Sequence, residues 1–141
     1  MKQKLIALAL CLFAGSGNAQ DLLLFGGSGH SEFLGCFNCS KHNSGSICNK
    51  HGKGSKHNSD SIINKYGEFG SKYSSSSPWN KYSSDNSVPV LVDREGNFYG
   101  YFTINKYRSD AVHFSRDLAT LFDSLDGDLE LVREALCEAF D

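Results

Sequence analysis

Five residues between positions 36 and 51 have the side chains and the spacing of a metal-binding segment. Cys36 and Cys39 are followed by His42, Cys48 and His51, with gaps of two, two, five and two residues. Thiolate and imidazole groups are the ligands of tetrahedral Zn²⁺ sites, and Cu⁺ also favours soft sulfur ligands. The segment therefore predicts zinc or copper binding as one possible function, and the other possibility is a protein without a cofactor.

A Lys followed directly by an aromatic side chain recurs along the chain, a pattern suited to polymer binding. Rings stack on nucleic-acid bases or on sugars, while ammonium groups neutralise anionic groups. The favoured structural interpretation is instead that the rings face inward and the Lys stems cover them. The candidate residues for contact with a polyanion or glycan are Lys65, Tyr66, Lys72, Tyr73, Trp79, Lys81 and Tyr82.

The sequence offers little for catalysis. His30, His113, Ser115 and Asp117 supply the residue types of a hydrolytic triad, but Ser is so abundant that the match carries little weight. Nucleophile-elbow, phosphate-loop and His-Glu-x-x-His motifs are absent. We therefore expect no catalytic residues and a function other than that of an enzyme.

The first 19 residues are predicted to be a secretory signal peptide. Lys2 and Lys4 precede an apolar run over 5–13, and small residues lead to Ala19, after which we expect cleavage. The run is too short to span a bilayer and no second one follows, so we expect no transmembrane segment. The remaining residues, 20–141, are predicted to form a single domain in the periplasm or outside the cell. Intracellular nucleic acid is accordingly disfavoured as a partner, and a cell-envelope polymer or a protein partner is favoured.

Export also offers a second interpretation of the cysteines. An even number of Cys in an oxidising compartment favours disulfides, with three possible pairings. A strand over 33–39 would point Cys36 and Cys39 to opposite faces, so we expect that these two do not easily bridge each other. The disulfide candidates after the predicted signal peptide are Cys36, Cys39, Cys48 and Cys137.

Charge is distributed unevenly along the predicted domain. Residues 40–83 contain seven Lys against two acidic residues, a net charge of +5. Residues 110–141 contain nine acidic residues against two Arg, a net charge of −7. The two halves could bind a polyanion and carry an acidic tail, or could form opposite surfaces that attract each other within one domain. The second interpretation is favoured.

The segment 40–83 contains three copies of one motif, at 40–52, 55–67 and 71–83, offset by fifteen and then sixteen residues. Such regularity indicates an ordered array rather than a flexible linker. One Ser in each copy is placed as a helix N-cap, and Pro78 suits a first helical position. Short helical turns are therefore predicted over 46–51, 61–66 and 77–82.

The segments that flank the array predict an α+β fold. Residues 33–39 read as a strand, and 88–105 read as a β-hairpin with a tight turn over 94–97. The tail, 113–140, has apolar residues at helical spacing and predicts two amphipathic helices that cover one face of the sheet. We expect a small antiparallel sheet of about three strands, an irregular array of short helical turns and two C-terminal helices.

The array also carries a longer pattern that resembles a known family. The pattern is Asn64-Lys65-Tyr66-Gly67-Glu68-Phe69-Gly70-Ser71-Lys72-Tyr73-Ser74-Ser75, followed by Ser77-Pro78-Trp79-Asn80 and the strand Asn97-Phe98-Tyr99-Gly100-Tyr101. It resembles a family of small exported bacterial proteins whose function is uncharacterised, so the resemblance implies export and no activity. It covers roughly residues 33–108. Where the repeat would be expected to carry Tyr, this chain has His42, His51 and His57.

Taken with the composition, these patterns favour an exported, non-catalytic interaction or structural protein of the cell envelope or periplasm. The alternative is a periplasmic zinc- or copper-binding protein that uses the Cys/His segment over 36–57.

Overall fold

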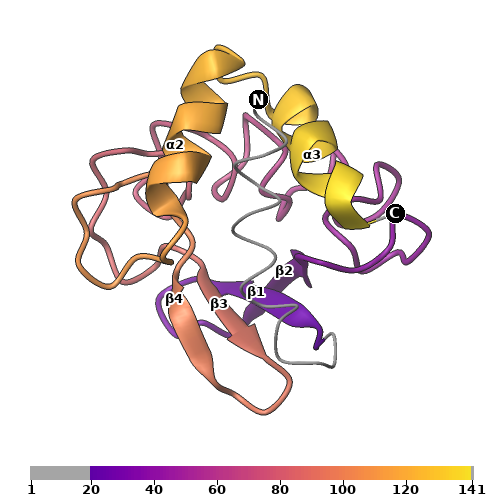
Figure 1. Ribbon diagram of the computed structural model, residues 1–141, viewed down its shortest axis with the longest axis horizontal. Helices are drawn as coiled ribbons and strands as arrows, with labels where there is room; N and C mark the ends of the chain where they lie inside the picture. Colours follow the sequence, from indigo (N-terminus) through magenta and orange to yellow (C-terminus); the bar gives the residue numbers. More distant parts are fainter. Residues whose placement is uncertain (1–19, 141) are drawn as a thin grey trace.

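Four antiparallel strands form one sheet, in the order β2-β1-β3-β4, in the computed structural model, which describes residues 20–140 (Figure 1). The strands are β1 (Leu22–Gly26), β2 (Glu32–Cys36), β3 (Val90–Asp93) and β4 (Phe98–Tyr101). The helices are α2 (Ser115–Ser124) and α3 (Leu129–Cys137), with a 3-10 turn η1 (Glu138–Phe140). The predicted mixture of a small antiparallel sheet and two C-terminal helices is thus confirmed. The predicted signal peptide, 1–19, lies outside the described residues.

The strand that the sequence did not predict is β1, which pairs with β2 on one side and β3 on the other. Leu22, Leu23 and Leu24 are all buried, at 2%, 8% and 0% exposure. A half-exposed strand shows apolar and polar residues in alternation, and this run has none because both of its faces are covered. The sheet therefore has four strands rather than about three.

Residues 40–83 form a succession of tight turns. About every third backbone N–H donates to the carbonyl three residues earlier, at 2.9–3.4 Å. The residue at which one turn ends and the next begins is in most cases Ser or Asn. Its side-chain oxygen also accepts the backbone N–H of the residue two positions further on. Ser61 Oγ accepts from Ile63 N at 3.0 Å, and Asn64 Oδ1 accepts from Tyr66 N at 3.0 Å. Each side chain thus closes its own turn, as Ser and Asn commonly do outside helices.

The predicted helical turns of the array are therefore wrong. Ser46, Ser61 and Ser77 do accept an N–H two residues on, from Cys48, Ile63 and Trp79, as helix N-caps would. The next turn, however, starts three residues later, so no helix follows within the array. The predictions concerned are those over 46–51, 61–66 and 77–82.

A three-residue turn also explains the spacing of the copies. Fifteen residues hold five such turns, and the sixteenth residue before the third copy is accommodated at Gly70. There the N–H groups of Gly70 and Ser71 both donate to Gly67 O, at 3.2 and 2.9 Å. A Cβ on Gly70 would lie 1.9 Å from Asn64 O, so the extra residue has to be glycine.

Some turns of the array face outward and others face inward. The outward turns carry the Lys–aromatic pairs, and the inward turns carry the buried pairs Ile47-Cys48, Ile62-Ile63 and Pro78-Trp79. Trp79 is 1% exposed, and its indole stacks on Phe122 of α2 with centroids 5.5 Å apart and planes at 8°. One hydrophobic core thus joins the inward turns to the helices and to Leu24, Leu34 and Leu91 of the sheet.

The two helices cover the array rather than a face of the sheet, which corrects the sequence prediction. No Cα atom of α2 or α3 lies within 8 Å of a Cα atom in any of the four described strands. Figure 1 shows the helices at the top, beside the array, and the sheet at the bottom. Buried Arg133 of α3 donates from Nη1 to Gly54 O at 2.7 Å, and the Cys48–Cys137 disulfide joins α3 to the first copy. Between residues 20 and 140, no helix is long and apolar enough to cross a bilayer.

The β3–β4 turn is organised by one carboxylate, that of Asp93. It accepts the backbone N–H groups of Glu95 and Asn97 at 2.9 and 3.0 Å, Asn97 Nδ2 at 2.9 Å and the Tyr99 hydroxyl at 2.9 Å. These bonds, led by that of the Asn97 side chain, lower the pKa of Asp93 from 3.8 to about 2. The same contact raises the pKa of Tyr99.

We expect acid to weaken the hairpin through Asp93. Because the pKa is lower in the folded protein than in the unfolded chain, the carboxylate stabilises the fold above pH 3.8, and this contribution is lost as pH falls towards about 2. Urea unfolding across that window, compared between the wild type and Asp93→Asn, measures the effect. A variant with the same pH dependence as the wild type would contradict this role for Asp93.

Candidate functional site

The four cysteines of the described chain form two disulfides, Cys36–Cys39 and Cys48–Cys137. The prediction of disulfides is confirmed, but the expectation that Cys36 and Cys39 do not pair is wrong. The strand ends at Cys36 rather than continuing to residue 39, and the bend that follows brings the two Cα atoms to 5.6 Å. That separation is ordinary for a disulfide.

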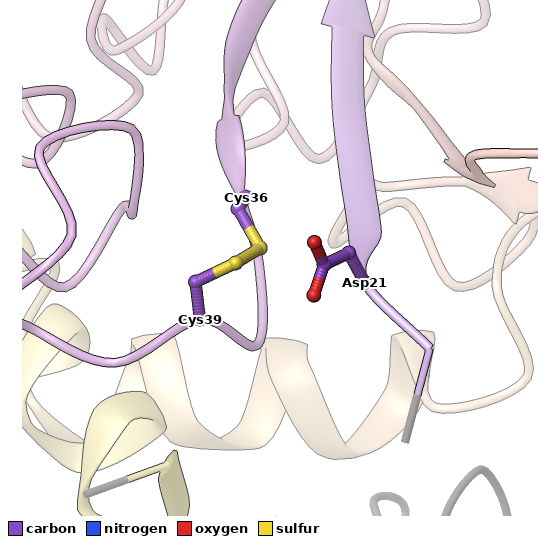
Figure 2. Close-up of side chains that lie close together, drawn as sticks. All are labelled: Asp21, Cys36 and Cys39. Atoms are coloured by element: carbon purple, nitrogen blue, oxygen red, sulfur yellow. A yellow bond between two sulfur atoms is a disulfide. The ribbon is translucent and has the colours of Figure 1, made fainter. Parts of the chain in front are cut away.

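One group of potential metal ligands occurs in the described part of the chain, formed by Asp21, Cys36 and Cys39. One ligand atom from each lies within 4.8 Å of the others, and Figure 2 shows the carboxylate beside the disulfide. The two sulfur atoms are bonded to each other, and Asp21 Oδ2 accepts from Arg94 Nε and Nη2 at 2.9 and 2.8 Å. A disulfide supplies no thiolate, so this group has lost the donors that zinc or copper requires.

Three of the five predicted metal ligands, His42, Cys48 and His51, line one groove beside α3, whereas Cys36 and Cys39 are bonded to each other in a disulfide. Cys36 and Cys48 belong to different disulfides, while His42 and His51 project from exposed turns. Neither His joins the group at Asp21. Metal binding through Cys36, Cys39, His42, Cys48 and His51 therefore stays a prediction for the reduced protein.

The Tyr rings of the Lys–aromatic pairs face solvent, which corrects the inward orientation favoured from the sequence. Tyr66, Tyr73, Tyr82 and Tyr107 are 85%, 83%, 81% and 81% exposed. In each case the Nζ of the preceding Lys lies 5.2–5.6 Å from the ring centroid. Both residues occupy the apex of one turn, so the ring could not be buried without its ammonium, and burial of an unpaired charge is costly.

Six of the seven predicted contact residues are accordingly available to a ligand, and Trp79 is not. The six are Lys65, Tyr66, Lys72, Tyr73, Lys81 and Tyr82. Trp79 lies in an inward turn, and its Nε1 donates to Ile62 O at 2.6 Å. Its indole supports the exposed pairs from below and presents no free face.

Three adjoining grooves, which we call the groove row, lie between successive aromatic residues of the array. The first lies between His57 and Tyr66, the second between Tyr66 and Tyr73, and the third between Tyr73 and Tyr82. Their volumes are about 550, 520 and 620 Å³. Neighbouring grooves share the Lys–Tyr pair that separates them, so an extended molecule could occupy all three.

The connection between α2 and α3 forms the opposite wall. Asp126 and Gly127 line all three grooves, and both adopt positive φ, at 55° and 72°. Gly127 N donates to Phe122 O at 2.9 Å, which ends α2 and turns the chain beside the array. Asp128 begins α3 as an N-cap, accepting from the backbone N–H groups of Glu130 and Leu131.

The groove row thus brings together the two charged halves of the sequence. Lys side chains of the array face Asp123, Asp126, Asp128 and Glu130, and Lys56 Nζ lies 3.4 Å from Glu130 Oε2. This arrangement agrees with the favoured interpretation of two opposite surfaces within one domain. The floor is apolar and consists of Ile63, Trp79, Ile104, Phe122 and Leu129.

No family model, curated protein or solved structure matches the chain. What the groove row could bind is therefore inferred from its own side chains alone. The sequence did not predict its acidic wall, although the excess of carboxylates over 110–141 and the break at Asp126-Gly127-Asp128 are signals that could have done so. The resemblance to small exported proteins stays an expectation.

Proposed function

We propose that the protein is an exported, non-catalytic binding protein whose ligand is an extended cell-envelope polymer lying along the groove row. The observation that carries the proposal is the exposure of Tyr66, Tyr73 and Tyr82, at 81–85%, on the walls between grooves. Exposed rings next to ammonium groups can stack on flat or ring-shaped ligand units and hydrogen-bond to them. A binding surface whose chemistry recurs along the chain suits a ligand that also repeats itself.

The turn bonds support this function because they fix the backbone at each Tyr before a ligand binds. Tyr66 N and Tyr82 N each donate to the Asn that opens the turn, at 3.0 Å, and Tyr73 N donates to Ser71 Oγ at 3.2 Å. A surface ordered in advance loses less conformational entropy on binding. Binding of this kind requires no catalytic group. Ser115, the only hydroxyl of the triad-like set of residues, is buried and donates from Oγ to the Thr103 carbonyl at 2.6 Å.

The proposed location is the periplasm or the outside of the cell, where an envelope polymer is within reach. The predicted signal peptide supports it, and so do the two disulfides, since such bonds persist in oxidising compartments.

The test is co-sedimentation with insoluble cell-wall polymer isolated from the source organism. The variant Tyr66→Ala/Tyr73→Ala/Tyr82→Ala is expected to bind about a hundredfold more weakly, since each ring contributes about 1 kcal/mol of stacking. Tyr107→Ala is the matched control, because Tyr107 has the same exposure, its own Lys106 and a turn bond to Asn105 Oδ1, yet lines none of the three grooves. Equal losses in both variants, or none in the triple variant, would contradict the proposal.

A further inference from the structure

We infer that the groove row binds a chain of N-acetylated amino sugars rather than a polyanion, an inference that rests on the proposed polymer-binding function. It follows from two properties of the grooves, namely the sign of the charges on their walls and the chemistry of their floor.

The walls of each groove carry both signs of charge. The second groove has Lys65 and Lys72 on the array side and Asp126 on the helix side. The third has Lys72 and Lys81 opposite Asp123 and Asp126. A phosphate or sulfate polymer would gain from the Lys row but would share the grooves with carboxylates, and repulsion between like charges opposes the gain. A neutral polar chain avoids this conflict.

Neutral sugars can use both walls at once. Their hydroxyl and amide groups donate to carboxylates and accept from ammonium groups, which makes hydrogen bonds to charged partners. The C–H face of a sugar ring packs on an exposed ring such as Tyr66 or Tyr73. Volumes of about 520–620 Å³ lie within the range of small-ligand sites, about 300–1,000 Å³.

The floor adds a small apolar surface, which the hydroxyl groups of a plain hexose would not use. Trp79 is covered, and the floor of the second groove is exposed only at Phe122 and Leu129, at 9% and 6%, so the apolar surface that it offers is small. It suits a methyl group better than a further ring. An acetamido substituent supplies that methyl together with an amide N–H and carbonyl for the polar walls.

The inference is tested by calorimetric titration of the purified protein with two hexasaccharides of matched backbone, chitohexaose and cellohexaose. They differ in carrying an acetamido or a hydroxyl group at carbon 2. We expect chitohexaose to bind about tenfold more tightly or better, because one small apolar group filling a site commonly gives that discrimination. Its affinity should change little between low and high salt, whereas a polyanion would lose affinity steeply.

Asp123→Asn/Asp126→Asn supplies a variant with the opposite charge balance. It is expected to weaken chitohexaose binding severalfold and to strengthen binding of inorganic polyphosphate, because the Lys row is then less opposed. If the variant bound both ligands as the wild type does, the role of the acidic wall would be contradicted. Lys56 and Glu130 are left intact, so the ion pair between the array and α3 is unchanged.

The outcomes separate this inference from the function on which it rests. Equal affinity for both hexasaccharides, lost in the triple Tyr variant, would overturn the acetamido inference and leave polymer binding intact. If the protein bound only polyphosphate, and bound it more weakly at high salt, the inference of a glycan ligand would be overturned and the proposal of a polymer ligand would stand. Failure of the wild type to bind any polymer, including cell wall, would overturn both.

Discussion

Trp79→Ala is expected to lower the free energy of unfolding by about 4 kcal/mol, which is typical of a buried Trp replaced by Ala. The side chain is 1% exposed, stacks on Phe122 and meets Phe102 edge-on at 5.9 Å. Removing it leaves a cavity between the array and α2, and also leaves Ile62 O without the indole N–H that donates to it at 2.6 Å. A buried carbonyl that loses its donor adds to the cost.

Two further variants separate the contributions. Trp79→Phe keeps an aromatic ring against Phe122 but has no N–H for Ile62 O, so we expect a loss of about 1–3 kcal/mol. Tyr82→Ala removes a ring that is 81% exposed and should leave stability unchanged within about 0.5 kcal/mol. Urea unfolding followed by circular dichroism measures all three variants. A loss below about 1 kcal/mol for Trp79→Ala would contradict its place in the core.

The array shows where interpretation of the sequence succeeded and where it failed. The fifteen- and sixteen-residue spacing is visible in the letters, but the three-residue turn inside it was read as short helices. Ser61 illustrates the reason, because a helix N-cap and a single turn both place a side-chain oxygen on the N–H two residues on. What distinguishes them is that Ser, Asn or Gly recurs about every third position, which a helix of 3.6 residues per turn would not need.

The long-range arrangement could not be read in the same way. Hydrophobic periodicity predicted α2 and α3 but not the surface that they cover, because a helical stripe packs equally well on a sheet or on a row of inward turns. The inward residues Ile62 and Ile63 are adjacent in sequence and fit neither a helical nor a strand period. The Tyr rings were predicted to face inward for a related reason. The sequence does not show that each ring shares one outward turn with its Lys, which exposes both side chains.

The second large effect concerns the Cys48–Cys137 disulfide. Its cysteines are 89 residues apart, so it restricts the unfolded chain far more than a local bridge does. The chain-entropy relation gives a loss of about 4.6 kcal/mol for Cys48→Ser/Cys137→Ser. The native protein also loses the covalent link between α3 and the first copy of the repeat, where Arg133 and Gly54 form the neighbouring polar contact.

Cys36→Ser/Cys39→Ser is the matched control, because it also removes one disulfide and two sulfur atoms. Its cysteines are only three residues apart, and the same relation gives about 2 kcal/mol. We therefore expect the midpoint of urea unfolding to fall much further for the first variant than for the second. If the two midpoints coincided, chain entropy would not be what the long disulfide contributes, and its role would reduce to local packing at Cys48. The expected order instead makes the distant bridge the larger contributor to stability, because it restricts the unfolded chain over 89 residues.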